Sequence, residues 1–409
     1  DSLLAGANLV SRLALEAIPD LGLRLQLDWI NAALELRGLE PVRFNSELGS
    51  TPFDQLDCDI PPERDIESPE MVSVLVPAFN SAPWLETAVR GLLKQTWRNL
   101  EVIIIDDCST DDTLAVANAL ATTDARIRVL ANKVNQGAYA SRNYGLQFAH
   151  GHFITVHDAD DWSHPRKIER QMLALQAQDN TVANMSKSVR IDPASLKFFA
   201  QYGREILRQN SSSLLFKRNP VFTELGYWDE VKFGADTEYH HRINAKFGLG
   251  SAPTINSGLL SFTRFHTESL TGGGKNSTVR GIIGARRDYV RKFSETTAKE
   301  IEKILKALAS DASKGIEAEG VKKSEIRTAY QVDVRYHGQG LRLSVEVNLA
   351  DLQKKGLKAI ADKFKADTGI EVQYVAVTTD DVTKRAVTAP NSFDLIDTEY
   401  FSLKKIVPT

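Results

Sequence analysis

FITVHDADDW, residues 153–162, is the stretch from which most of the fold and the site are predicted. It opens with four apolar residues, the length of a short strand, and Asp158, Asp160 and Asp161 follow at once. A second apolar run, VIIIDD at 102–107, also ends in acidic residues. Because the carboxyl ends of parallel strands meet at one edge of a sheet, we expect these carboxylates to lie close together.

Short apolar runs and helical segments alternate on both sides of these two stretches. Strands that are almost continuously apolar are typical of a parallel sheet covered by helices on both faces, so the predicted fold class is α/β. Such sheets bind ligands at the carboxyl ends of their strands. We expect strands at 72–77, 102–107, 127–130 and 153–156, and helices at 86–95, 113–121 and 138–149.

Asp158 and Asp160 are the candidate metal ligands. Carboxylate oxygens at this density suit Mg²⁺ or Mn²⁺, which binds through one or two carboxylates together with substrate phosphates. Crowded carboxylates also repel one another unless a cation is present. The alternative is an acidic turn in which Asp161 caps the following helix. The strand-end position and the second acidic pair favour the metal site.

Asp107 and Arg142 are candidates for contact with a nucleotide. A carboxylate at the end of a parallel strand can accept hydrogen bonds from a base or ribose. The alternative is that the run STDD at 109–112 only caps the next helix. Arg142 follows a turn at Gly137 and could face phosphate or ribose, although alone it would be an ordinary surface arginine.

Asp236 and His266 are candidates that depend on their context. An acid in the run GADTE at 234–238 could take the proton of an acceptor hydroxyl as a general base. Without the other motifs it would be a helix-start cap. His266 could bind a ligand or a phosphate, but a lone histidine is more often structural.

The composition excludes several classes of protein. The chain has 409 residues, a formal charge of −3 and 42% hydrophobic residues, so it has no basic footprint for nucleic acid. Its two cysteines, Cys58 and Cys108, are too few for a disulfide framework and indicate a reducing compartment. No apolar run reaches the ~18–20 residues that span a bilayer, and no secretory leader is seen. We expect a cytoplasmic protein that can also associate peripherally with the inner face of the membrane.

The sequence predicts four regions. Residues 1–69 form a helical N-terminal region and a linker rich in proline and charge, with a helix at 25–36 and Gly38 as its C-cap. The α/β domain follows at 70–292. The residue composition and pattern change beyond this domain, and two further regions follow at 293–348 and 349–409. There we expect Lys-rich helices, a strand pair at 331–347 and a strand at 370–377.

Taken together, five stretches resemble a family 2 glycosyltransferase with the GT-A fold. The resemblance covers about residues 1–292, and the sequence around HDADDW resembles the bacterial subgroup associated with surface polysaccharide assembly. The chain lacks the Q-x-x-R-W run of processive synthases, which favours transfer of one sugar at a time. The matching stretches are VSVLVPAFN (72–80), LLKQTWRNLEVIIIDDCSTDDT (92–113), NQGAYASRNYGLQFAHG (135–151), FITVHDADDWSHPRKIERQ (153–171) and LGYWDEVKFGADTEYHHRI (225–243).

The resemblance implies a function and a set of roles. The reaction would be an inverting transfer from a nucleoside-diphosphate sugar, a UDP-sugar by default, to a hydroxyl of a glycan or lipid-linked acceptor. A divalent cation, Mn²⁺ or Mg²⁺, would be required. By this resemblance Pro77, Asn80, Asp107, Arg142 and Asp158 would contact the nucleotide sugar, Asp158 and Asp160 would hold the metal, and Asp236 would be the catalytic base.

The resemblance ends near residue 293. Residues 293–348 look like a fragment of a hydantoinase/oxoprolinase A subunit, and residues 349–409 look like the start of a periplasmic solute-binding protein. Neither piece is a complete domain, so the interpretation we favour is a chimera. Two alternative functions follow: a catalytically impaired, nucleotide-sugar-binding chimera, and a solute-binding protein, which only the last ~60 residues support.

Overall fold

The computed structural model describes residues 19–199, 206–248, 250–266, 289, 330–336 and 341–347. The chain divides into two compact units, Asp1–Val290 and Arg291–Thr409. None of the described helices combines the length and the apolar content that crossing a bilayer requires.

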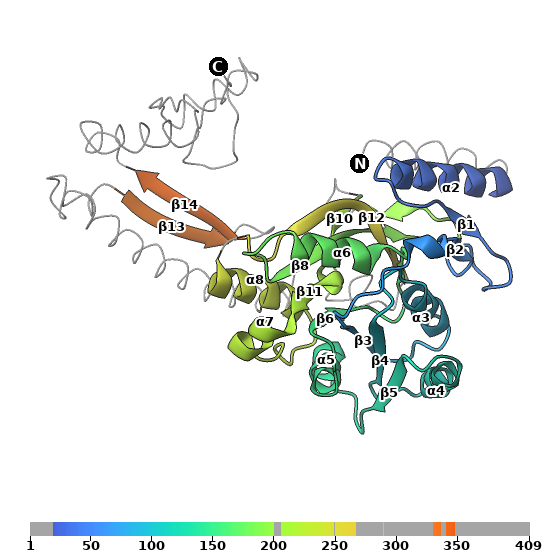
Figure 1. Cartoon of the computed structure of the whole chain (residues 1–409), viewed down its shortest axis with the longest axis horizontal. Coiled ribbons are helices and arrows are strands. Elements are labelled where there is room, and N and C mark those ends of the chain that lie inside the picture. Colours follow the sequence, from blue (N-terminus) through green and yellow to red (C-terminus); the bar gives the residue numbers. More distant parts are fainter. Residues whose placement is uncertain are drawn as a thin grey trace, which may run out of the picture. The chain divides into compact units, whose positions relative to one another are not determined.

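The first unit contains a mixed sheet with strand order β5-β4-β3-β6-β11-β8-β12-β7, and β9 and β10 pair with β8 (Figure 1). Its strands are β3 (Val72–Ala78), β4 (Leu100–Asp106), β5 (Ile127–Ala131), β6 (Phe153–Val156), β7 (Trp162–Ser163), β8 (Ala183–Ile191), β9 (Phe198–Phe199), β10 (Arg208–Gln209), β11 (Leu215–Lys217) and β12 (Thr254–Arg264). Its described helices are α2 (Pro19–Glu35), α3 (Leu85–Leu93), α4 (Thr113–Thr123), α5 (Ala138–Gln147), α6 (Lys167–Gln176), α7 (Arg218–Leu225) and α8 (Ala235–Phe247), with 3₁₀ turns η1 (Pro62–Arg64) and η2 (Ser211–Ser213).

Strands β5, β4, β3 and β6 are parallel, whereas β11 pairs antiparallel with β6 and β8. The predicted α/β class and the strands and helices predicted between residues 72 and 156 are confirmed, with ends that differ by a few residues. The antiparallel pairs after residue 183 were not predicted.

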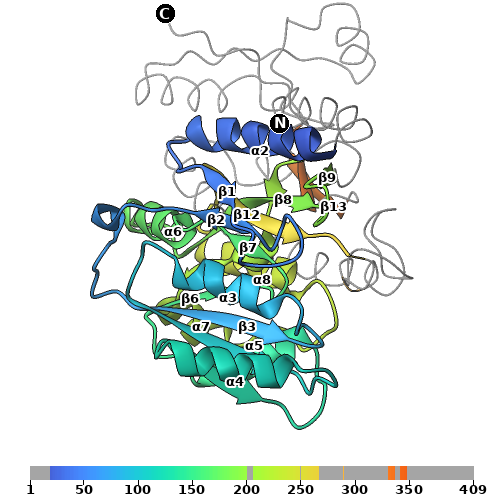
Figure 2. The same ribbon diagram turned by 90° about the vertical axis from the view of Figure 1, so that its right-hand side faces the viewer.

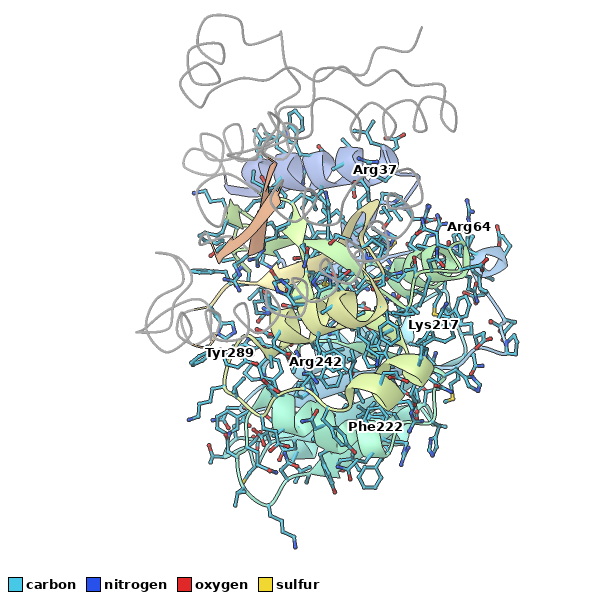
Figure 3. The ribbon with its side chains drawn as sticks, turned by 90° about the vertical axis from the view of Figure 1, so that its left-hand side faces the viewer. Arg37, Arg64, Lys217, Phe222, Arg242 and Tyr289 are labelled. Carbon is cyan, nitrogen blue, oxygen red and sulfur yellow. The ribbon has the colours of Figure 1, made fainter. Side chains whose placement is uncertain are left out.

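Both faces of the parallel strands β3, β4 and β6 are buried, as their composition requires. Val72, Val74 and Val76 of β3 pack against α3, α4 and α6, while Leu75 packs on the other face against α5 and residues of α8. Successive side chains of a strand point to opposite faces, so one apolar strand supplies both cores. Arg242 of α8 donates to the carbonyl of Leu225 at the end of α7 (2.8 Å), which holds these two helices together (Figure 3).

The N-terminal region shares its core with the α/β domain. Ile30 and Leu34 of α2 are fully buried in one cluster with Trp162, Val189 and Phe262. A hairpin of β1 (Val42–Phe44) and β2 (Leu56–Cys58) follows α2, and both lie against the same end of the sheet (Figure 2). The helix predicted at 25–36 is confirmed within α2, and Gly38 ends it with φ +60°.

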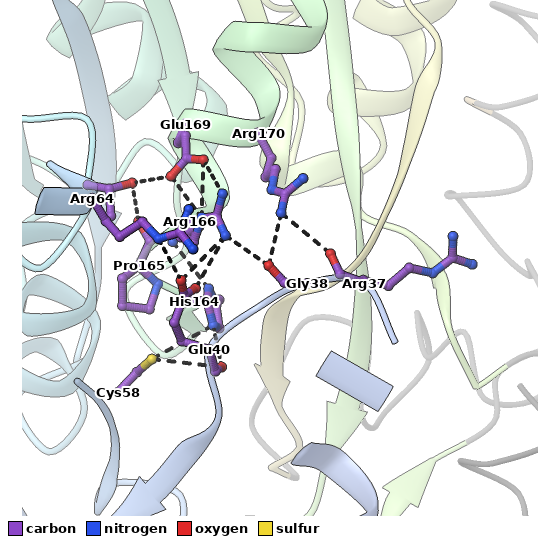
Figure 4. A network of polar contacts seen from close by, with 11 residues as sticks. Arg37, Gly38, Glu40, Cys58, Arg64, His164, Pro165, Arg166, Glu169 and Arg170 are labelled. Carbon is purple, nitrogen blue, oxygen red and sulfur yellow. Dashed lines mark hydrogen bonds and ion pairs between the residues drawn. The ribbon is translucent and has the colours of Figure 1, made fainter. Parts of the chain in front are cut away.

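A buried polar network ties the segment after α2 to the start of α6 (Figure 4). His164 Nε2 lies 2.9 Å from the carbonyl of Glu40, and His164 Nδ1 accepts from the backbone N–H of Arg166. Arg166 donates to the carbonyl of Gly38 (2.8 Å) and pairs with Glu169. Because Nδ1 accepts a hydrogen bond, His164 is neutral, and burial lowers its pKa to about 4.

In the second unit, the described residues form one hairpin. β13 (Tyr330–Tyr336) pairs antiparallel with β14 (Leu341–Val347), which confirms the strand pair predicted at 331–347. The helices and the strand at 370–377 predicted elsewhere in this unit lie outside the described residues.

Leu34→Ala should lower the free energy of unfolding of the first unit by about 2–5 kcal/mol, because the substitution leaves a cavity in the shared core. Leu36, which is 69% exposed, provides the matched control, and Leu36→Ala should change that free energy by no more than about 0.5 kcal/mol. Denaturant unfolding followed by tryptophan fluorescence measures this unit alone, since the five tryptophans all precede residue 291. Equal effects of the two substitutions would contradict the shared core.

Acid should destabilise the first unit through His164. The unfolded side chain takes up a proton near pH 6.5, whereas the folded one resists protonation down to about pH 4, so stability is lost as pH falls through this window. His164→Gln removes the titration, so the loss of unfolding free energy between pH 7 and pH 5 should shrink by about 2 kcal/mol. An unchanged pH dependence in the variant, measured by urea unfolding, would contradict this.

Candidate functional site

The carboxyl ends of β3, β4 and β6 meet at one edge of the sheet, as the sequence predicted. Asp106 is the last residue of β4, and Asp158 and Asp160 follow β6 directly. The register pairs Ala78, at the end of β3, with Asp106. Two acidic runs that are about 50 residues apart in the chain therefore meet at this edge.

Asp158 forms an ion pair with Arg142, whose Nη2 lies 2.9 Å from Asp158 Oδ1. Arg142 is on α5 and is 2% exposed. Among the described residues its Nε and Nη1 have no hydrogen-bond partner. A buried guanidinium with free donors is suited to an anionic ligand, because leaving the donors unpaired is costly.

Asp160 lies against His266, with 2.9 Å between Asp160 Oδ2 and His266 Nε2. The His266 ring also packs on Trp84, with 4.4 Å between ring centroids. Nδ1 of His266 is buried and has no partner among the described residues. The structure thus brings this isolated histidine of the sequence to the acidic edge.

Asp161 is the most buried member of the acidic run, and Arg264 contacts it directly. The backbone N–H of Arg264 donates to Asp161 Oδ1 (3.0 Å), and its Nε donates to the carbonyl of Asp160 (3.0 Å). The Arg264 guanidinium forms an ion pair with Asp54, in the loop between β1 and β2, and lies over the Phe53 ring. The N-terminal region thereby supports the loop that carries the candidate metal ligands.

The negative charges at the acidic edge repel one another. Burial raises the pKa of Asp158, and the charge of Asp160 adds to this while Arg142 opposes it. Burial, with the charges of Asp160 and Asp158, raises the pKa of Asp161 well above its usual range. An additional cation at this edge would relieve the repulsion.

Asp158 and Asp160 fit a cation that is shared with a phosphate ligand. Among the residues that the structure describes, no three His, Cys, Asp or Glu side chains converge as an all-protein metal cage. Mg²⁺ and Mn²⁺ sites in nucleotide-dependent enzymes are held by one or two carboxylates, with substrate phosphates supplying further oxygens. The donor set and the raised pKa of Asp158 both suit such a cation.

Asp107 is buried, and both of its oxygens accept hydrogen bonds. Oδ1 accepts from Asn132 Nδ2 (2.8 Å) and the Gln136 N–H (2.9 Å), and Oδ2 accepts from the Gly137 N–H (2.7 Å). Asp107 therefore holds the turn that opens α5. Its neighbour Asp106 keeps a buried oxygen, Oδ1, without a partner among the described residues. The predicted contact of Asp107 with a nucleotide stays a prediction.

Pro77 and Asn80 lie at the end of β3, beside the same edge. Pro77 is buried in the strand opposite Ile105. Asn80 has a positive φ of 49°, and its Oδ1 accepts from the backbone N–H of Thr110 (2.9 Å). The loops after β3 and β4 are thus joined by this side chain.

Asp236 reaches the site from α8, in its first turn. Its Oδ1 accepts from the Tyr139 hydroxyl (3.0 Å) and from the Thr237 N–H (2.8 Å). Its negative charge contributes to the raised pKa of Asp158, so the two carboxylates share one electrostatic environment. The structure therefore brings Asp236 to the acidic edge, about 75 residues away along the chain.

Two residues of this site, Tyr139 and Arg264, were not predicted from the sequence. Tyr139 lies within helix α5 and Arg264 within strand β12, and the sequence pattern does not distinguish either residue from its neighbours. The nearest signals were the turn at Gly137 and the proximity of Arg264 to His266, and neither identifies a partner.

Residues 73–220 match the sequence model of the family described as Glycosyl transferase family 2. This part of the chain is therefore similar to family 2 glycosyltransferases. Glycosyltransferase GlyG of Streptococcus pneumoniae is 37% identical over 113 residues, which are 28% of this chain and 38% of GlyG. The Escherichia coli protein UDP-Glc:alpha-D-GlcNAc-diphosphoundecaprenol beta-1,3-glucosyltransferase WfaP is 36% identical over 109 residues, 27% of this chain and 43% of WfaP.

The alignments thus span less than half of either relative. The solved structure of S. aureus TarS 1–349 in complex with UDP-GlcNAc aligns with 56% of this chain and 66% of that one, at 18% identity and a TM-score of 0.44.

Proposed function

We propose that the α/β domain transfers one sugar at a time from a nucleoside-diphosphate sugar to an acceptor hydroxyl, with inversion at the anomeric carbon. The observation that carries the proposal is the meeting of Asp158, Asp160, Arg142 and Asp236 at one edge of a family 2 domain. We infer a glycan or lipid-linked acceptor, in line with the diphosphoundecaprenol-linked sugar in the name of the relative WfaP. We also infer a role in bacterial surface polysaccharide synthesis.

The donor would bind through its diphosphate. Arg142 has two free donors, Nε and Nη1, that can pair with phosphate oxygens. Asp158 and Asp160 would hold Mn²⁺ or Mg²⁺ together with the same phosphates. When bound, the cation would offset the charge that develops on the departing diphosphate. We assign the nucleoside, uridine by default, to the end of β3 and β4, near Pro77, Asn80 and Asp107.

Asp236 would act on the acceptor. One of its oxygens, Oδ1, is engaged by Tyr139 and Thr237, whereas Oδ2 has no partner in the described part of the chain. The side chain is partly exposed, so Oδ2 can take the proton of an acceptor hydroxyl. The hydroxyl oxygen then attacks the anomeric carbon from the face opposite the diphosphate, the bond to the diphosphate breaks, and a single displacement inverts the configuration.

Asp236→Asn should lower the transfer rate by about 10²–10⁴-fold, because the amide keeps the Tyr139 contact but cannot accept the proton. Binding of the donor should be unchanged. Transfer is measured with a panel of nucleotide sugars and Mn²⁺, and NMR of the product gives its anomeric configuration. Unchanged turnover would exclude Asp236 as the base, and retention of configuration would exclude the single displacement.

Asp160→Ala should weaken donor binding that depends on the cation. Thermal-shift titrations with UDP-sugars should show stabilisation of the wild type that increases with Mn²⁺, and this increase should vanish in the variant. Asp179→Ala, at an exposed acid after α6, is the control and should behave as the wild type. Equal binding with and without Mn²⁺ in the wild type would refute the metal site.

A further inference from the structure

Tyr139 occupies a position between the two halves of the site. Its side chain is 7% exposed, and its hydroxyl lies 3.0 Å from Asp236 Oδ1 on α8. The same hydroxyl accepts the backbone N–H of Gly234 (3.1 Å). Its ring lies under Arg142, with the guanidinium carbon 5.1 Å from the ring centroid. One side chain thus contacts both the candidate base and the arginine that pairs with Asp158.

The hydrogen-bond directions at Tyr139 are determined by its partners. The Gly234 N–H can only donate, so the hydroxyl oxygen accepts there and its own proton goes to the Asp236 carboxylate. Burial and the neighbouring Asp236 raise the pKa of Tyr139, so the hydroxyl keeps this proton. The hydroxyl is therefore a fixed donor to one oxygen of the carboxylate.

The conformation of Gly234 explains why the first turn of α8 needs the contact with Tyr139. It precedes α8 with φ +86°, a left-handed conformation, and so the chain enters the helix through a turn that few residues can form. The body of α8 is held separately, because Tyr239 donates to the carbonyl of Gly226 (2.8 Å) and Arg242 to that of Leu225. Tyr139 adds the contact that orients the first turn, where Asp236 lies.

We propose that Tyr139 is a positioning residue for the acceptor-activating base. Resting on the proposed function of Asp236, this assignment states that the hydroxyl fixes Asp236 Oδ1 and thereby directs Oδ2 towards the acceptor. The ring packs under Arg142 and thereby fixes the position of the base relative to the diphosphate end of the site. Misplacement of a catalytic group by about 1 Å can cost 10²-fold in rate, so loss of the hydroxyl alone should be measurable.

Tyr139→Phe tests the proposal, because it removes the hydroxyl and keeps the ring under Arg142. We expect kcat for transfer to fall by roughly 10–100-fold, while the KM for the donor and Mn²⁺-dependent donor binding stay within about twofold of the wild type, since these depend on the diphosphate end. Tyr144→Phe is the matched control on the same helix; its ring packs edge-on against Phe148, and it should leave transfer unchanged.

A double-substitution cycle distinguishes positioning from a general loss of structure. In an Asp236→Asn background the base is already lost, so adding Tyr139→Phe should not lower the residual transfer further. A second drop of 10-fold or more there, or a kcat of Tyr139→Phe equal to the wild type, would overturn the proposal while leaving the transferase function intact. A wild type that transfers sugar from no nucleotide donor would overturn the proposed function, and this inference with it.

Discussion

Repulsion among carboxylates at the end of β6 is the constraint around which this end of the molecule is organised. Asp158, Asp160 and Asp161 lie within four residues, and the pKa of Asp161 is well above its usual range. Each is compensated from a distant part of the chain. Arg142 pairs with Asp158, the Arg264 backbone holds Asp161, and a histidine lies on Asp160. Charges crowded in this way are tolerated only where opposite charges or bound cations balance them.

This constraint extends to the N-terminal region. Arg264 holds the acidic loop, and its guanidinium is in turn paired with the buried Asp54. The segment after α2 is also joined to the start of α6 through Glu40 and Arg166. Residues that precede the glycosyltransferase match therefore support the geometry of the site. The described part of the N-terminal region is therefore physically part of the same unit as the α/β domain, through its core and its charges.

The two halves of the proposed reaction depend on one helix. α5 supplies Arg142 towards the diphosphate side and Tyr139 towards Asp236, and the turn that opens α5 is held by both oxygens of Asp107. Strand β4, through Asp107, therefore sets the start of the helix that carries both contacts.

The amino-acid pattern determined the parts of this protein that depend on neighbours in the chain. Apolar runs such as FITV are buried on both faces wherever they lie, and a parallel arrangement brings Asp106 and Asp158 to one edge. The pairings across the site came only from the tertiary structure. Tyr139 and Asp236 are 97 residues apart, and Asp54 and Arg264 are 210 apart. No local periodicity relates residues at such distances, because their contact depends on the place of β12 within the sheet and on how α8 and the N-terminal hairpin pack against that sheet.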